Sequence, residues 1–104
     1  MKAIIKEVGK EPKVIDIENT LKALQKAVGG YIETLNVGNN VIMLCDEEGK
    51  LKEKPYNFAF SNKLSDVIVG DVLFTKLNGD DFTDLDENDI ETILHFFSRT
   101  PYTT

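Results

Sequence analysis

The segment spanning residues 55–60 holds the side chains best suited to binding a planar ligand. It contains three aromatic residues and one asparagine in the five positions 56–60. Aromatic rings stack on planar molecules such as nucleobases, and an asparagine amide both donates and accepts hydrogen bonds that orient them. Lysines flank the segment and supply charge for a phosphate. The predicted ligand-binding residues are Lys54, Tyr56, Asn57, Phe58 and Lys63.

The same segment has a structural alternative. Phe58 and Phe60 are two positions apart, as expected for core residues of one irregular strand, and Asn57 would then cap a turn. The irregular stretch 52–66 that contains this segment is long for a connection in a small domain, because most connections run two to six residues. The sequence leaves both interpretations open.

A run of carboxylates between positions 80 and 91 is the second candidate surface. Its members are Asp80, Asp81, Asp84, Asp86, Glu87, Asp89 and Glu91. Residues 1–63 carry ten lysines against nine acidic residues, whereas residues 64–104 carry two basic residues against nine acidic ones. The run does not match a calcium-binding loop beginning at Asp80. Phe82 occupies the third position, which needs an oxygen ligand, and Leu85 the sixth, which needs glycine.

Three interpretations of this acidic run remain. Carboxylates in a first helical turn stabilise the helix dipole. Alternatively, Asp84, Asp86 and Glu87 form a partner-binding surface that imitates a phosphate backbone. A weak cation site is the third.

No spacing in the chain is typical of a catalytic centre. His95 is the single histidine and falls outside the apolar face of the last predicted helix, with Glu91 four residues before it. Cys45 is the single cysteine and lies in the apolar run 41–45, which favours a small buried side chain. We therefore expect a protein that is not an enzyme and that has no metal and no cofactor.

Length and charge restrict the class of protein. A chain of 104 residues with 41% hydrophobic residues builds one globular domain, here 1–104 with a loose tail at 100–104. A net charge of −6 with one arginine argues against direct binding of nucleic acid. No apolar stretch reaches the length of a membrane span, and the first residues do not resemble a signal peptide. We expect a cytoplasmic protein.

The hydrophobic pattern predicts a β-hairpin, a short helix, a meander and a C-terminal helix. The hairpin joins strands 2–8 and 13–17. A helix of about ten residues follows, capped by Asn19 and ended by Gly29-Gly30. Strands 31–37 and 41–45 come next, with a charged turn at 46–50 between strands of a meander.

The second half of the chain is predicted less regularly. A strand region at 67–77 is interrupted at Gly70, and a turn follows at 78–79. The last helix begins between 83 and 87 with a capping box formed by Asp86 and Asp89, and Pro101 ends it. The fold class is α+β, a small and mostly antiparallel sheet with helices packed on it, in which an exposed edge could pair with a second copy.

Several segments resemble one protein family. They are Met1–Glu7, Ile17–Gln25, Val28–Glu33, Met43–Lys50, the pair Pro55 and Asn57, and Asp66–Gly70. Together they resemble the domain of unknown function 3846 family over roughly residues 1–95. The resemblance implies an accessory protein of phages and mobile elements of Gram-positive bacteria, acting stoichiometrically against host systems.

Two functions follow as expectations. The first is counter-defence by sequestration of a small nucleotide signal at the 54–63 site, in a loop or between subunits of a homo-oligomer. The scarcity of arginine counts against a multiply phosphorylated ligand. The second is an acidic decoy that binds a host DNA-processing or defence protein through residues 80–91.

Overall fold

A six-stranded antiparallel sheet forms the centre of the computed structural model, which describes residues 1–60 and 67–99. Five strands follow the order β2-β1-β7-β4-β3, and β8 pairs with the end of β7. The strands are β1 (Lys2–Lys6), β2 (Lys13–Asp16), β3 (Ile32–Gly38), β4 (Val41–Asp46), β7 (Val72–Asn78) and β8 (Asp81–Thr83). The interior strands β4 and β7 are rich in buried apolar residues, as expected for strands covered on both faces.

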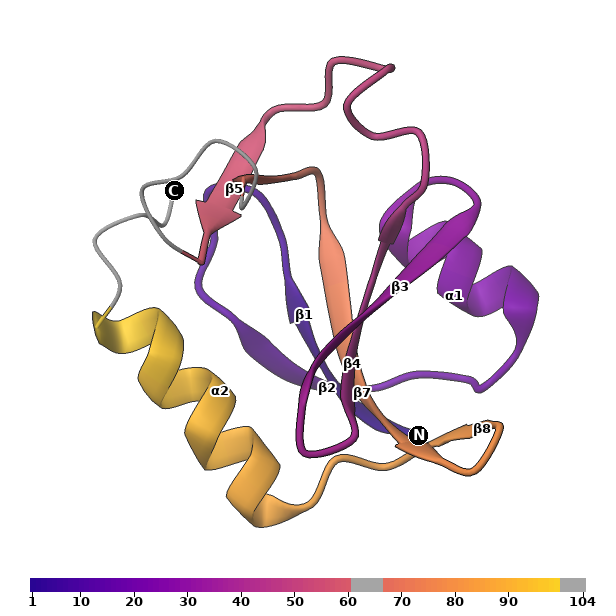
Figure 1. Cartoon of the computed structure of the whole chain (residues 1–104), viewed down its shortest axis with the longest axis vertical. Coiled ribbons are helices and arrows are strands. Elements are labelled where there is room, and N and C mark those ends of the chain that lie inside the picture. Colours follow the sequence, from indigo (N-terminus) through magenta and orange to yellow (C-terminus); the bar gives the residue numbers. More distant parts are fainter. Residues whose placement is uncertain (61–66, 100–104) are drawn as a thin grey trace.

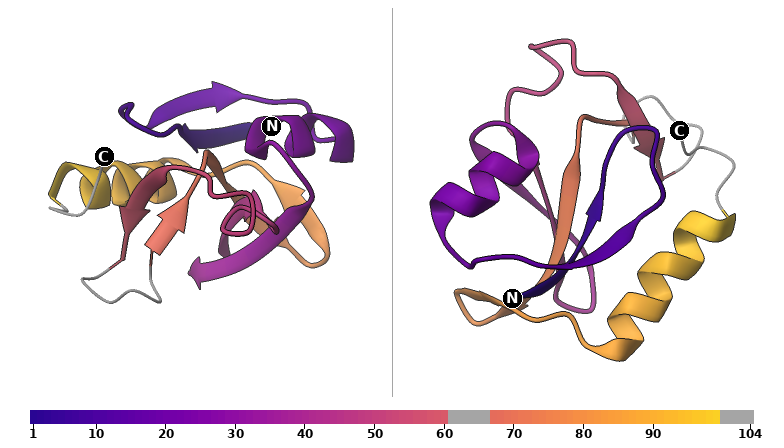
Figure 2. Two further views of the ribbon diagram at one scale, coloured as in Figure 1. Left: turned by 90° about the horizontal axis from the view of Figure 1, so that it is seen from above. Right: turned by 180° about the vertical axis from the view of Figure 1, so that it is seen from behind.

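Two helices and a separate two-stranded sheet cover the faces of the main sheet. Helix α1 (Leu21–Val28) and helix α2 (Glu87–Arg99) lie on either side of β1, β7 and β4 (Figures 1 and 2). The small sheet pairs β5 (Tyr56–Ala59) with β6 (Val67–Val69). None of the helices in the described ranges is long and apolar enough to cross a membrane.

Strand alternation divides the core into two clusters, one on each face. Leu24 and Val28 of α1 pack against Ile42, Leu44 and Leu73. The other cluster joins α2 and β5 to the sheet. Its buried residues are Ile4, Val41, Met43, Phe58, Val72, Phe74, Leu85, Ile93 and Phe97.

The predicted fold class is confirmed, and local signals account for much of it. The first hairpin forms, and α1 ends at Gly29, whose φ of 76° is the left-handed conformation that glycine adopts readily. Asp86 and Asp89 form the predicted capping box at the start of α2, each carboxylate accepting a hydrogen bond from the other residue's backbone N–H.

Four local predictions are wrong. Thr20, not Asn19, caps α1, because the Thr20 hydroxyl accepts from the Ala23 N–H while the Asn19 amide donates to the Phe82 carbonyl. Helix α1 has eight residues where about ten were predicted. The first strand ends at Lys6, two residues before the predicted end at residue 8. The strand after the 46–50 turn does not continue a meander with β4, because β5 pairs with β6 in the second sheet. Strand β8 was not predicted. The tail at 100–104 lies outside the described residues.

Candidate functional site

The predicted ligand segment lies largely inside the protein. Strand β5 turns Phe58 into the core, where its ring lies 4.9 Å from that of Phe97 and 5.3 Å from that of Phe60. Asn57 is equally buried. The structure therefore favours the core alternative for Phe58, whereas Phe60 keeps 37% of its surface exposed and Asn57, expected in that alternative to cap a turn, is buried. The ligand contact predicted for the Asn57 and Phe58 side chains is not available in this arrangement.

Asn57 ties the small sheet to the main one. Its amide nitrogen donates to the Lys6 and Gly70 carbonyls, both at 2.8 Å, and its amide oxygen accepts from Lys6 Nζ at 2.9 Å. Lys6 Nζ also donates to the Glu7 carbonyl. Burial lowers the pKa of Lys6, while the carboxylates of Glu11 and Asp71 oppose that shift. Asn57 is thus a structural link, and its position in the sequence did not indicate this role.

The remaining predicted ligand residues are dispersed. Tyr56 begins β5 opposite Val69 and keeps 37% of its surface exposed. Lys63 lies outside the described residues. Tyr56 therefore stays available at the surface, but the structure does not bring it together with Asn57 and Phe58 on an open face.

Lys54 closes the end of helix α1. Its Nζ donates to the Val28 carbonyl at 2.9 Å and the Gly29 carbonyl at 3.3 Å. The same Nζ lies 2.7 Å from Asp46 Oδ2, and Lys52 Nζ lies 2.9 Å from that oxygen. A cation near helix C-terminal carbonyls is favourable, so this lysine is engaged by the fold.

Asp46 is a buried carboxylate held by two lysines. Burial alone would raise its pKa, but hydrogen bonds from Lys54, Lys52 and the Glu48 N–H outweigh burial and hold the pKa well below its usual range. A Cβ at Gly30 would overlap the Asp46 carboxylate. The Gly29-Gly30 pair therefore ends a helix and also leaves space for this ion-pair cluster.

The acidic run is divided between structural and exposed carboxylates. Asp89 is buried and bonds Lys76 Nζ through both oxygens, at 2.9 and 3.1 Å. Asp84 is exposed and accepts from the Lys2 N–H, and Asp86 caps α2. Glu87 is exposed at the first position of α2. The three predicted partner-binding residues thus lie on the surface within one loop and helix start, although two also stabilise the fold.

The two residues considered for catalysis are differently placed. His95 is exposed on α2, as predicted, with its side chain outside the apolar face. Cys45 is half-buried on β4, and its Sγ contacts the Glu33 carbonyl at 3.8 Å. Within residues 1–60 and 67–99, no group of three His, Cys, Asp or Glu side chains could hold a metal ion.

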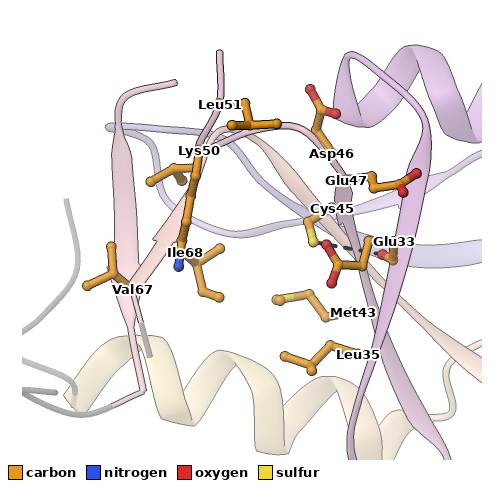
Figure 3. A pocket seen from close by; sticks show the side chains of 11 residues that line it. Glu33, Leu35, Met43, Cys45, Asp46, Glu47, Lys50, Leu51, Val67 and Ile68 are labelled. Atoms are coloured by element: carbon orange, nitrogen blue, oxygen red, sulfur yellow. Dashed lines mark hydrogen bonds between the residues drawn. The ribbon is translucent and has the colours of Figure 1, made fainter. Parts of the chain in front are cut away.

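A cavity of about 340 Å³ opens beside Cys45, between the β3–β4 hairpin and strand β6. Figure 3 shows the segments around it: β3 and β4 on one side, β6 on the other, and Lys50 and Leu51 above. We call this space the Cys45 cavity. Its lining residues are Glu33, Leu35, Met43, Cys45, Asp46, Glu47, Lys50, Leu51, Val67, Ile68 and Val69.

The Cys45 cavity has apolar walls and a charged rim. Met43, Leu35 and Ile68 supply apolar surface, whereas Glu33 and Lys50 bring opposite charges (Figure 3). Burial raises the pKa of the Cys45 thiol, and the Glu33 and Asp46 carboxylates raise it further. The thiol is therefore a weak nucleophile in this site.

Sequence reasoning did not find this cavity. Its walls come from strands that are distant along the chain, and β6 belongs to a second sheet whose position no local pattern indicates. The alternation of Glu33 and Leu35 on a strand was the one available signal, because it places both on the same face.

Comparison with known proteins identifies a family but no activity. The family model described as Domain of unknown function (DUF3846) matches residues 1–98. No curated protein and no solved structure matches the chain significantly. The match covers nearly the whole chain, including α1, both sheets, the Cys45 cavity and all of α2 except its last residue. The chain therefore belongs to the DUF3846 family, whose function is unknown.

Proposed function

We propose that this protein is a non-catalytic binding protein that holds one small molecule in the Cys45 cavity. The observation that carries this proposal is the cavity itself. Its volume of about 340 Å³ falls within the range of roughly 300–1,000 Å³ typical of small-molecule sites. Apolar walls with a few polar groups at the rim are also typical of such sites.

The rim limits the chemistry of the ligand. Lys50 is the only lysine or arginine among the described lining residues, which also include the carboxylates of Glu33, Asp46 and Glu47. This balance disfavours a multiply phosphorylated molecule and favours a flat, largely apolar one with at most one phosphate. A nucleotide signal fits this proposal as a base between Met43 and Ile68, with Lys50 as its cation.

The biological context is proposed from the sequence resemblance alone. As an accessory protein of a phage or mobile element, it would act in the host cytoplasm by sequestering a host defence signal. Sequestration needs one binding site per signal molecule and no turnover, which agrees with the weak nucleophile in the cavity. The predicted cluster of Tyr56, Asn57 and Phe58 gives this proposal little support, since two of the three are buried.

Native mass spectrometry of protein purified from phage-infected cells tests the proposal. A retained mass that disappears in Leu51→Arg is the expected result, because Leu51 is exposed at the cavity rim. The matched control is Leu21→Arg, an exposed leucine on α1 outside the cavity, which should keep the mass.

Reactivity of Cys45 gives an independent readout. A ligand in the cavity should slow labelling of this single cysteine by a thiol reagent at least fivefold. Cyclic nucleotides and ADP-ribose derivatives form the first panel. If no compound slows labelling or shifts the melting temperature, and no mass is retained, the protein is not a sponge for such signals.

The exposed carboxylates of Asp84, Asp86 and Glu87 support a second candidate function, an acidic decoy for a basic host protein. This proposal predicts binding that weakens with salt and weakens further in the triple variant Asp84→Asn, Asp86→Asn, Glu87→Gln. Because Asp84 and Asp86 also bond backbone N–H groups, circular dichroism must first establish that the variant is folded. A folded triple variant with full inhibitory activity would exclude the decoy.

A further inference from the structure

Strand β3 is an unprotected edge of the main sheet. It lies at the end of the strand order, and no strand among the described residues pairs with its outer side. Six of its seven residues are exposed, including Leu35 and Val37. An edge with these properties presents a row of backbone donors and acceptors to another chain.

The opposite edge, β2, shows the protection that β3 lacks. Strand β2 has four residues, follows Pro12, and carries Lys13 and Asp16 at its two ends. Proline, lysine and short length are the usual devices against edge pairing. Strand β3 has seven residues with no lysine, arginine or proline, and Glu33 is its single charge.

The outward backbone groups of β3 belong to Ile32, Thr34 and Asn36. The Glu47 N–H donates to the Tyr31 carbonyl at 2.8 Å, so Tyr31 and Glu47 form a hydrogen-bonded pair of the antiparallel ladder. Such pairs alternate along an antiparallel ladder, so Glu33 and Leu35 also point their backbone groups toward β4. The residues between them point theirs outward.

We propose that the partner of this edge is a second copy of the chain, paired antiparallel through β3 with Thr34 on the twofold axis. In this register Ile32 lies opposite the partner's Asn36, and Thr34 lies opposite the partner's Thr34. All outward donors and acceptors of the three residues are then used. A shift of two residues in either direction leaves part of them unpaired.

Side chains favour the same register. It places Glu33 opposite the partner's Leu35, whereas a twofold axis at Glu33 would set two carboxylates face to face. It also brings Tyr31 opposite the partner's Val37, and pairs of aromatic and β-branched residues stabilise antiparallel strands. Tyr31 is 66% exposed in the single chain, so this pairing would cover apolar surface at both ends of the seam.

The pairing also joins the two Cys45 cavities. The twofold axis runs perpendicular to the sheet, so both copies present the same face to the same side. Glu33 and Leu35 line the cavity and would stand at the seam, and the cavities of the two copies become neighbours on one continuous sheet. The dimer stands without the proposed function; only the shared ligand site rests on it.

Molar mass measured by light scattering and sedimentation, between 5 and about 500 µM, tests the pairing. The wild-type chain should have twice the monomer mass of 11.7 kDa. Thr34→Pro removes one outward N–H, which an edge strand tolerates, and should weaken dimerisation at least tenfold. The control Thr34→Ala keeps the N–H and should remain dimeric.

A disulfide test fixes the register. In a Cys45→Ser background, Thr34→Cys should cross-link to its symmetry mate on mild oxidation, because Cα atoms of a hydrogen-bonded pair lie about 5.5 Å apart. Asn36→Cys, which faces the partner's Ile32, should not. If Thr34→Pro does not fold, the comparison of Thr34→Cys with Asn36→Cys still tests whether β3 pairs with a second copy in this register.

A wild-type monomer throughout the concentration range would overturn the proposal and leave the edge to a strand of a different protein. Equal cross-linking of Asn36→Cys would overturn the register. Loss of the retained small-molecule mass with an intact dimer would instead count against the proposed function alone.

Discussion

Asp46 is the residue on which two parts of the chain depend. Its carboxylate is buried beside Gly30 and joins β4 to Lys52 and Lys54. Lys54 in turn satisfies the last carbonyls of α1. A buried carboxylate of this kind is stable only while its partners stay in place, because an isolated buried charge is costly.

Asp46→Asn should lower the free energy of unfolding by about 3 kcal/mol, since it leaves two lysines without their shared carboxylate. Urea denaturation monitored by circular dichroism measures the change. Glu7→Gln is the control. The Glu7–Lys10 ion pair spans 3.6 Å on the surface, and its loss should cost about 0.5 kcal/mol or less. An equal loss of unfolding free energy in the two variants would mean that the buried Asp46 cluster stabilises the protein no more than the surface ion pair does.

The contribution of Asp46 should also depend on pH. Its pKa is lower in the folded chain than the value of about 3.9 in an unfolded one. Its stabilisation is therefore complete above about pH 5 and is lost as pH falls through the folded pKa. The stability difference between wild type and Asp46→Asn should be constant from pH 8 to 5 and shrink below about pH 4. A difference unchanged at pH 3 would contradict the assigned shift.

At the scale of elements, the small β5–β6 sheet depends on a side chain rather than on strand pairing. Neither strand continues the main ladder. Asn57 supplies the link through hydrogen bonds to Lys6 and Gly70, and Phe58 packs beneath α2. The apolar walls of the Cys45 cavity that come from β6 therefore depend on the Asn57 amide together with the packing of Phe58.

Asn57→Ala should cost about 3 kcal/mol, because it removes three buried hydrogen bonds: two donated to the Lys6 and Gly70 carbonyls and one accepted from Lys6 Nζ. Asn88→Ala, at an exposed position of α2, should change stability by about 0.5 kcal/mol or less. Thermal unfolding compares the two variants. A small effect at Asn57 would show that packing of Phe58 alone holds the second sheet.

The cap of α1 gives a direct comparison between neighbours. Thr20→Ala removes the hydroxyl that accepts from the Ala23 N–H and should destabilise by about 1 kcal/mol. Asn19→Ala removes an exposed bond to the Phe82 carbonyl and should cost about 0.5 kcal/mol or less. Urea midpoints measured at equal slopes distinguish them, and the reverse order would restore Asn19 as the cap.

What the sequence predicted, and what it did not, follows the range of the interactions. Gly29 and the Asp86–Asp89 box act within one helical turn, so the sequence pattern was sufficient to locate the C-terminal end of α1 and the start of α2. The displacement of β5 into a second sheet depends on Asn57 meeting Lys6 across 51 positions. Neither Phe58 nor the Cys45 cavity could be assigned correctly without that long-range contact.

At the scale of the whole molecule, charge is segregated while the edge strand is nearly neutral. The chain carries −6, yet β3 contributes a single carboxylate. Two copies repel each other at long range, although their proposed contact is mostly backbone and apolar. An acidic decoy would behave in the opposite way, attracting a basic partner at long range.

Salt should therefore separate the two kinds of association. Raising ionic strength from 10 to 150 mM shortens the screening length from about 30 to about 8 Å. The dissociation constant of the β3 dimer should fall, because repulsion between like charges is screened. Binding to a basic partner through residues 80–91 should weaken. Sedimentation at several salt concentrations measures the first, and a dimer that weakens with salt would contradict a backbone-mediated contact.

The Lys54–Asp46 cluster also constrains how the family can diverge. A side chain at position 30 would enter the space of the Asp46 carboxylate, and a Cβ at Gly70 would lie 2.7 Å from Lys54 Cδ. The four residues in contact are Gly30, Asp46, Lys54 and Gly70. A substitution at one of them is therefore acceptable only with a compensating substitution at another. Aligned relatives should show them changing together, as residues in spatial contact do.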